Sequence, residues 1–134
     1  MTALQALLGF AAWTLLLIAA VFLYRGLRFL GGTPINHWPR QAKPLDDAPL
    51  VQRLEDAHAN CLENLPLFAV IVLTAAALER LADIQTLAPF VLYGRIGQTL
   101  AHLSGTGPAN VFVRASFWFV QLALFVWMLA KLMD

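Results

Sequence analysis

The amino-acid sequence predicts an all-α integral membrane protein, built as a four-helix transmembrane bundle. Hydrophobic residues make up 60% of its 134 residues, and charged residues make up only 13%, about half the ~25% typical of soluble domains. The mean hydropathy is +0.68. Long apolar runs alternate with short polar breaks. Polar residues also recur inside these runs at helical spacing, and in hydrocarbon such residues need partners from neighbouring helices.

Four helices are expected within a single domain that covers residues 1–134. Their approximate bounds are residues 2–28, 50–80, 86–104 and 109–132. The first contains ALLGFAAWTLLLIAAVFLY, and about 20 such residues cross a hydrocarbon layer of ~30 Å. The predicted breaks are a loop rich in proline and glycine at 31–49, a short polar turn, ERLADIQ, and the segment SGTGP.

The second helix begins with a stripe of polar residues in the segment RLEDAHANCLENLPLF, residues 53–68. At 3.6 residues per turn, five polar side chains fall within about 100° of one another. They are Arg53, Asp56, Asn60, Glu63 and Asn64. His58 points to the opposite side. Polar groups at this depth are costly, so the stripe is expected to face a bundle interior or a ligand.

Two other helices carry polar stripes of the same kind. Arg95, Gln98, Thr99 and His102 share one face of the third helix, and Arg114, Phe117, Trp118 and Gln121 share one face of the fourth. Together the stripes predict one polar pocket. Glu63 is the expected partner of Arg95. A salt bridge that only fixes helix packing and a ligand site are equally compatible with this pattern.

The distribution of basic residues predicts the orientation in the membrane. Arg25, Arg28, Arg40, Lys43 and Arg53 cluster around the first loop, whereas Arg80 and Lys131 are the basic residues near the opposite side. The positive-inside rule therefore places the first and third loops in the cytoplasm.

Composition and spacing argue against several other classes of function. The net charge of +1 gives no electrostatic case for a nucleic-acid partner. The single cysteine, Cys61, cannot form an intramolecular disulfide and is expected to be a small buried hydrophobe. The spacing of the histidines suggests no metal site. The sequence contains neither a glycine-rich phosphate loop nor a serine-type catalytic motif.

The second helix carries the pattern N-C-x-E-x-x-P-x-F, formed by Asn60, Cys61, Glu63, Pro66 and Phe68. This pattern resembles the MAPEG family, the membrane-associated proteins in eicosanoid and glutathione metabolism. Arg53 matches a recurrent arginine of the family, Arg95 in GRIGQTLAH matches an arginine of its third helix, and Arg114 in RASFWF is similar to the one opening its fourth. The chain looks like a divergent, bacterial-type member, which implies a bacterial inner membrane.

The resemblance implies a homotrimer with active sites between subunits near the cytoplasmic face. It implies a glutathione-type thiol-dependent transferase or peroxidase, with glutathione as cosubstrate and no metal. The substrates would be lipophilic electrophiles or lipid hydroperoxides that enter from the membrane lipids. The implied ligand-binding residues are Arg53, Asn60, Glu63 and Arg95. The polar stripe adds Gln98 and His102 as candidates, although His102 is equally read as a polar interface residue at the helix end. Arg114 would be the catalytic residue, placed nearest the sulfur, where a cation favours the thiolate.

The sequence also departs from the family pattern. Asp56 stands where transferases of the family usually carry a basic residue, and Asn64 stands where a tyrosine is common. Gln98 and His102 replace tyrosines that pack on glutathione. These departures leave open another thiol or none, and the alternative function is a non-catalytic lipid-binding or scaffold protein of the same fold. A small transporter subunit has less support, because no inverted repeats are seen.

Overall fold

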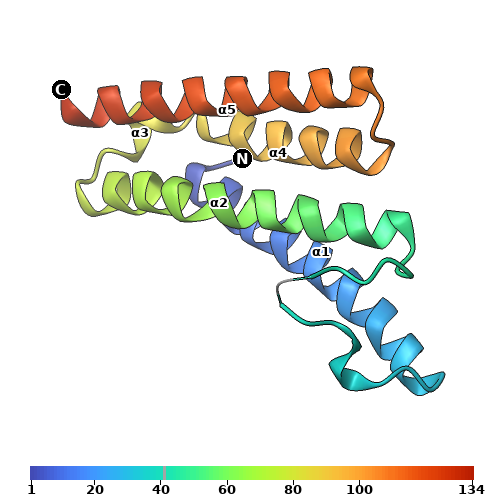
Figure 1. Cartoon of the computed structure of the whole chain (residues 1–134). Coiled ribbons are helices and arrows are strands. Elements are labelled where there is room, and N and C mark those ends of the chain that lie inside the picture. Colours follow the sequence, from blue (N-terminus) through green and yellow to red (C-terminus); the bar gives the residue numbers. More distant parts are fainter. Residues whose placement is uncertain (41) are drawn as a thin grey trace.

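The computed structural model describes residues 1–40 and 42–134, and it contains helices, turns and loops but no strand in these ranges. Figure 1 shows the later long helices lying roughly along one another, with the N-terminal helix (blue) set obliquely to them. The elements in chain order are α1 (Ala3–Leu30), the 3-10 turn η1 (Ile35–His37), α2 (Pro49–Ala77), α3 (Leu81–Ile84), α4 (Ala88–Leu103) and α5 (Pro108–Met133).

Three of these helices, α1, α2 and α5, are long and apolar enough to cross a membrane. The fourth long helix, α4, has 16 residues, which corresponds to about 24 Å of helix. Large apolar side chains stand exposed on the outer faces of the bundle, among them Leu8, Phe22 and Phe119. An apolar surface of this extent needs lipid or other protein to cover it. The chain is therefore a membrane protein.

The bundle has two layers, with α1 packed against α2 and α4 packed against α5 (Figure 1). Contacts of α4 with α1 and α2 join the layers. A row of three buried phenylalanines crosses the interior: the ring centroids of Phe10 and Phe68 lie 6.0 Å apart, and those of Phe68 and Phe125 lie 6.1 Å apart. This apolar half of the bundle is close-packed around rings from α1, α2 and α5.

The segment between α2 and α4 differs from the expected polar turn. The second helix ends at Ala77 rather than near residue 80, because Glu79 has a φ of 58° in the left-handed region and turns the chain. Residues Leu81–Ile84 then form the short helix α3, whose Ile84 is fully buried. The third long helix consequently starts at Ala88, two residues later than expected.

Arg80 fixes this connection to the end of α5. Its Nε donates to Asp83 Oδ2 at 2.7 Å, and its two terminal nitrogens donate to the backbone carbonyls of Leu132 and Lys131 at 3.1 and 2.8 Å. The last carbonyls of a helix lack donors within the helix, so the guanidinium satisfies them. This contact keeps the α3 end of the bundle closed.

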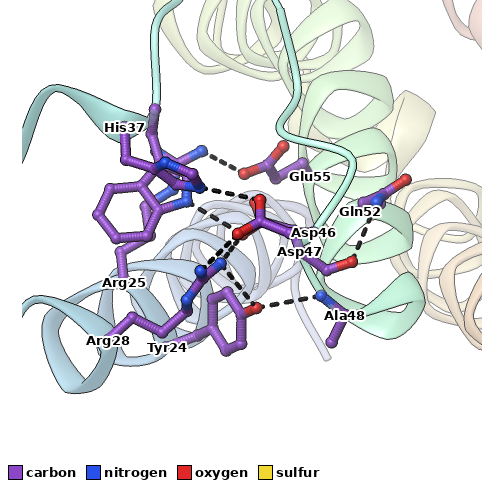
Figure 2. Close-up of polar contacts among 10 residues, drawn as sticks. Tyr24, Arg25, Arg28, His37, Asp46, Asp47, Ala48, Gln52 and Glu55 are labelled. Atoms are coloured by element: carbon purple, nitrogen blue, oxygen red, sulfur yellow. Dashed lines mark hydrogen bonds and ion pairs between the residues drawn. The ribbon is translucent and has the colours of Figure 1, made fainter. Parts of the chain in front are cut away.

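The first loop, residues 31–48, is held by polar contacts beside the second half of α1. Arg28 donates to Asp46 Oδ2 and Asp47 Oδ1, at 2.7 Å each (Figure 2). The Asp47 side chain is fully buried and also accepts from Trp38 Nε1 at 3.1 Å. The Tyr24 hydroxyl accepts from the backbone N–H of Ala48 at 3.0 Å. These contacts hold Trp38 and residues 46–48 of the loop against α1.

Candidate functional site

A cleft of about 620 Å³ opens between α2, α4 and α5 at the end of the bundle that carries the first and third loops. We call this end the loop end. The cleft is lined from α2 by Asp56, Ala59, Asn60 and Glu63, from α4 by Gln98 and His102, and from α5 by Val111, Arg114, Ala115 and Trp118. Its walls thus come from the three helices that carry the polar stripes.

The approach of α5 to α4 beside the cleft depends on Gly97. A Cβ atom at this position would lie 2.7 Å from the Phe117 ring, well inside van der Waals contact. Because Gly97 has no side chain, Phe117 can pack directly on the α4 backbone. Arg114 and Trp118, three residues before and one after Phe117, line the cleft.

The cleft brings together ionisable groups of both signs. Asp56 and Glu63 on α2 are acidic, and Arg114 on α5 is cationic. Nε2 of His102 lies 4.0 Å from Asp56 Oδ2, and Nδ1 of this buried histidine has no hydrogen-bond partner. Lys43 from the first loop forms an ion pair with Asp56. A ligand with charges of both signs would find complementary groups here.

A buried polar network lies beneath the cleft. Arg95 is 1% exposed, and one of its terminal nitrogens donates to Gln121 Oε1 at 2.6 Å. Gln121 Nε2 in turn donates to Gln98 Oε1 at 3.4 Å. The Arg95 guanidinium also lies 5.4 Å from the centroid of the Phe10 ring. Gln98 therefore belongs both to this network and to the cleft wall.

The expected ion pair between Glu63 and Arg95 does not form within the described residues. Arg95 is bonded to Gln121 on α5, whereas Glu63 is exposed on the cleft wall. The helical spacing had identified the polar face of each helix correctly. It could not show that the guanidinium turns towards α5 and the bundle interior rather than towards α2.

Five of the seven residues expected from the sequence line the cleft: Asn60, Glu63, Gln98, His102 and Arg114. Arg95 does not, because it is buried below. Arg53 does not either, because its Nε donates to the backbone carbonyl of Leu103 at 3.2 Å. Leu103 is the last residue of α4, and its carbonyl has no partner inside the helix.

The structure also gives the positions of the other residues that the sequence analysis discussed. His58 points away from the cleft, into a separate cavity beside α1. Asn64 donates to the backbone carbonyl of Asn60 within its own helix, at 3.2 Å. Cys61 is fully buried, as expected for a small hydrophobe. On α4, Thr99 accepts a hydrogen bond from Trp13 Nε1 at 3.2 Å, which links the stripe to α1.

The sequence reasoning missed several lining residues as site residues. Asp56 and Trp118 were expected on the polar stripes and do line the cleft, but Asp56 was not named as a ligand-binding residue. Ala59, Val111 and Ala115 were not assigned to the site. The signal was present in the spacing, since Val111, Ala115 and Trp118 lie three or four residues apart on the face of Arg114. Small and apolar side chains carry no chemistry that would single them out.

The fold and the cleft define a helical membrane protein with a polar site at one end of its bundle. The model of the MAPEG family matches residues 3–133, nearly the whole chain, and the protein belongs to this family. Membership supports a membrane function related to glutathione or eicosanoids. Neither a curated protein nor a solved structure was found to match the chain.

Proposed function

We propose that this protein is a membrane-embedded, thiol-dependent transferase or peroxidase that uses glutathione as its thiol. Its substrates are lipophilic electrophiles or lipid hydroperoxides. The observation that carries the proposal is the composition of the cleft, where two carboxylates, two amides and a guanidinium meet apolar side chains of α5. A soluble, charged thiol and an apolar substrate can both reach such a site.

The polar groups of the cleft match those of glutathione, which carries two carboxylates and one ammonium. Glu63 is exposed on the wall and binds the ammonium. Asn60 and Gln98 offer amide groups to the peptide bonds of the ligand. His102 and Arg114 are the cationic or potentially cationic side chains that line the cleft. They face the carboxylates and the sulfur.

Arg114 is the residue we assign to the reacting sulfur. A guanidinium beside a thiol favours the thiolate, which is the nucleophile. In a transfer reaction the thiolate forms a carbon–sulfur bond, and the leaving group departs with its electron pair. In a peroxidase reaction the thiolate attacks the hydroperoxide oxygen, the O–O bond breaks, and the alkoxide takes a proton to become an alcohol. A second glutathione converts the resulting sulfenic acid to a disulfide and releases water.

The apolar side of the cleft serves the second substrate. Val111, Ala115 and Trp118 line it from α5, and the neighbouring faces of α5 expose Phe112 and Phe119. An electrophile dissolved in lipid would approach along this surface. The site thus lies where the soluble and the lipid-borne substrates can meet.

The assembly and orientation belong to the same proposal. A homotrimer would cover part of the exposed apolar surface and place the cleft between subunits, with α4 as the fourth membrane-crossing helix. The loop end, which carries Arg25, Arg28, Arg40 and Lys43, would face the cytoplasm of a bacterial-type cell. Cross-linking in mild detergent is expected to give a trimer, and a cross-linked sample that contains only monomer would contradict this.

The activity is tested with detergent-purified protein and two substrates, 1-chloro-2,4-dinitrobenzene for conjugation and cumene hydroperoxide for reduction. Glutathione is compared with cysteine as the thiol, and boiled protein is the control. We expect glutathione-dependent turnover of at least one substrate. Stable, trimeric protein without turnover of either would instead support a non-catalytic lipid-binding or scaffold protein of the same fold.

A further inference from the structure

A second cavity lies on the other side of α2, between that helix, α1 and the first loop. Its volume is about 660 Å³. The basic side chains of Arg25, Arg40 and Lys43 line it together with the carboxylate of Glu55, and Ile18 and Leu62 provide apolar wall. The cleft described above and this cavity have no lining residue in common.

An apolar groove adjoins this cavity. The groove has a volume of about 320 Å³ and is lined by Phe22, Phe29 and Ile35. Two residues, Arg25 and Trp38, line both the cavity and the groove. A polar space therefore opens directly beside an apolar one, with a guanidinium and an indole at the boundary.

The charges of the cavity favour an anion. Three cationic side chains line it against one carboxylate. Arg25 pairs with Glu55, yet its buried Nε has no hydrogen-bond partner. Lys43 pairs with Asp56, which lies outside the cavity, and the described residues provide no acidic partner for Arg40. The lining keeps a surplus of positive charge even with these pairs formed.

The boundary between cavity and groove is held in place by the loop. Trp38 Nε1 donates to the buried Asp47. The guanidinium groups of Arg25 and Arg28 lie 5.8 and 5.6 Å from the centroid of the Trp38 ring. Arg28 itself is fixed by Asp46 and Asp47 (Figure 2). Trp38 is thus held at this boundary by contacts within the protein.

Gly26 keeps the groove open. It lies inside α1, where glycine is less favourable than alanine. Apart from the neighbouring residues and backbone of α1, no atom of the described residues lies within 4 Å of the position that a Cβ would take. Among these residues, neither a close helix contact nor an unusual backbone conformation requires glycine here. A side chain at this position would enter the groove.

We propose that the cavity and groove together bind an anionic phospholipid, with its phosphate among Arg25, Arg40 and Lys43 and one acyl chain along Phe22 and Phe29. Basic pockets beside membrane helices are suited to such headgroups, and tryptophan favours the membrane interface. The continuity of a cationic cavity with an apolar groove selects a ligand that is anionic at one end and apolar at the other.

Native mass spectrometry of the detergent-purified protein tests this proposal. The probes are dioleoyl phosphatidylglycerol and dioleoyl phosphatidylcholine, which share their acyl chains and differ in headgroup charge. The anionic lipid is expected to bind more tightly. The double variant Arg40→Gln, Lys43→Gln should lose this preference, by about fivefold for each cation removed. Gly26→Leu should weaken binding of the anionic lipid by filling the groove.

Lys131→Gln is the matched control, because it removes one exposed positive charge from the last turn of α5. This end of α5 lies at the opposite end of the bundle from the first loop (Figure 1). It should leave the preference unchanged. Equal binding of the two lipids, or an equal loss of preference in Lys131→Gln, would overturn the proposal. The proposal would also be overturned if oleate bound as tightly as the phospholipid, or if inorganic phosphate at millimolar concentration displaced the phospholipid. A changed subunit number in Gly26→Leu would assign the groove to subunit packing instead.

Discussion

The two halves of the bundle differ in how closely their helices pack. Towards α3, α2 and α5 join α1 in the close-packed row of Phe10, Phe68 and Phe125. Towards the loop end, α4 and α5 stay packed on each other, and the cleft opens between this pair and α2. Arg95 and Gln121 lie beneath the cleft. The difference indicates that the apolar half provides stability, whereas the loop end can keep polar side chains available to a ligand.

The largest loss of stability is expected from Phe68→Ala in the apolar half. The substitution removes a fully buried ring between two others, and the cavity left behind should cost about 3–5 kcal/mol of stability. Reversible unfolding in mixed detergents measures it. Trp118→Ala, at a cleft residue that is 41% exposed, is the comparison and should cost far less. Equal costs for the two would mean that the halves do not differ in packing.

Gln121→Leu tests the network between the halves. It removes the acceptor of a buried guanidinium, and a buried charge left without its partner costs about 3 kcal/mol or more. The double variant Arg95→Met, Gln121→Leu removes the charge as well and should unfold later than the single variant. If the stability lost in the double variant equalled the sum of the losses in the two single variants, the two side chains would not be coupled.

Arg114→Leu should affect activity rather than stability. The residue is half-buried on the cleft wall and makes no ion pair among the described residues. If Arg114 stabilises the thiolate, conjugation should fall about a hundredfold or more, with the yield and oligomeric state of the purified protein unchanged. Arg114→Lys keeps the charge and should retain part of the activity. Full activity in Arg114→Leu, with a changed lipid dependence, would identify Arg114 as an arginine that reaches to lipid headgroups.

The smallest effect is expected on the stability of the first loop at acid pH. Hydrogen bonds from Arg28 and His37 lower the pKa of Asp46 to about 2, from an ordinary value of 3.8. The contribution of this carboxylate to loop stability is therefore present above pH 3.8 and lost as the pH falls through about 2. Limited proteolysis of the loop should show wild-type protection at pH 4 and weaker protection in Asp46→Asn. Equal cleavage of both proteins at pH 4 would contradict the role of Asp46.

Much of this architecture follows from helical periodicity and apolar length. The ends of α1, α2 and α5 lie within three residues of the predicted bounds, because long apolar segments between polar breaks leave few alternatives. The polar faces of α2, α4 and α5 were also predictable, and they supply most of the cleft. These features depend on local sequence alone.

The partners of single side chains were not predictable in the same way. A periodic pattern identifies the face on which Arg53 and Arg95 lie, but not the neighbour that this face meets. Arg53 reaches the carbonyl of Leu103 and Arg95 reaches Gln121, through contacts that depend on the tertiary arrangement. The helical turn α3 was missed because four residues carry too little periodicity to be recognised.

Thermal unfolding of the detergent-purified protein, with and without millimolar glutathione, tests most directly whether the cleft binds glutathione. A ligand at 100 times its dissociation constant stabilises by about 2.7 kcal/mol. We predict a concentration-dependent rise in the unfolding temperature that is reduced in Glu63→Gln and retained in Lys131→Gln. No rise in the wild-type protein at saturating glutathione, or an equal rise in Glu63→Gln, would contradict the assignment of the cleft.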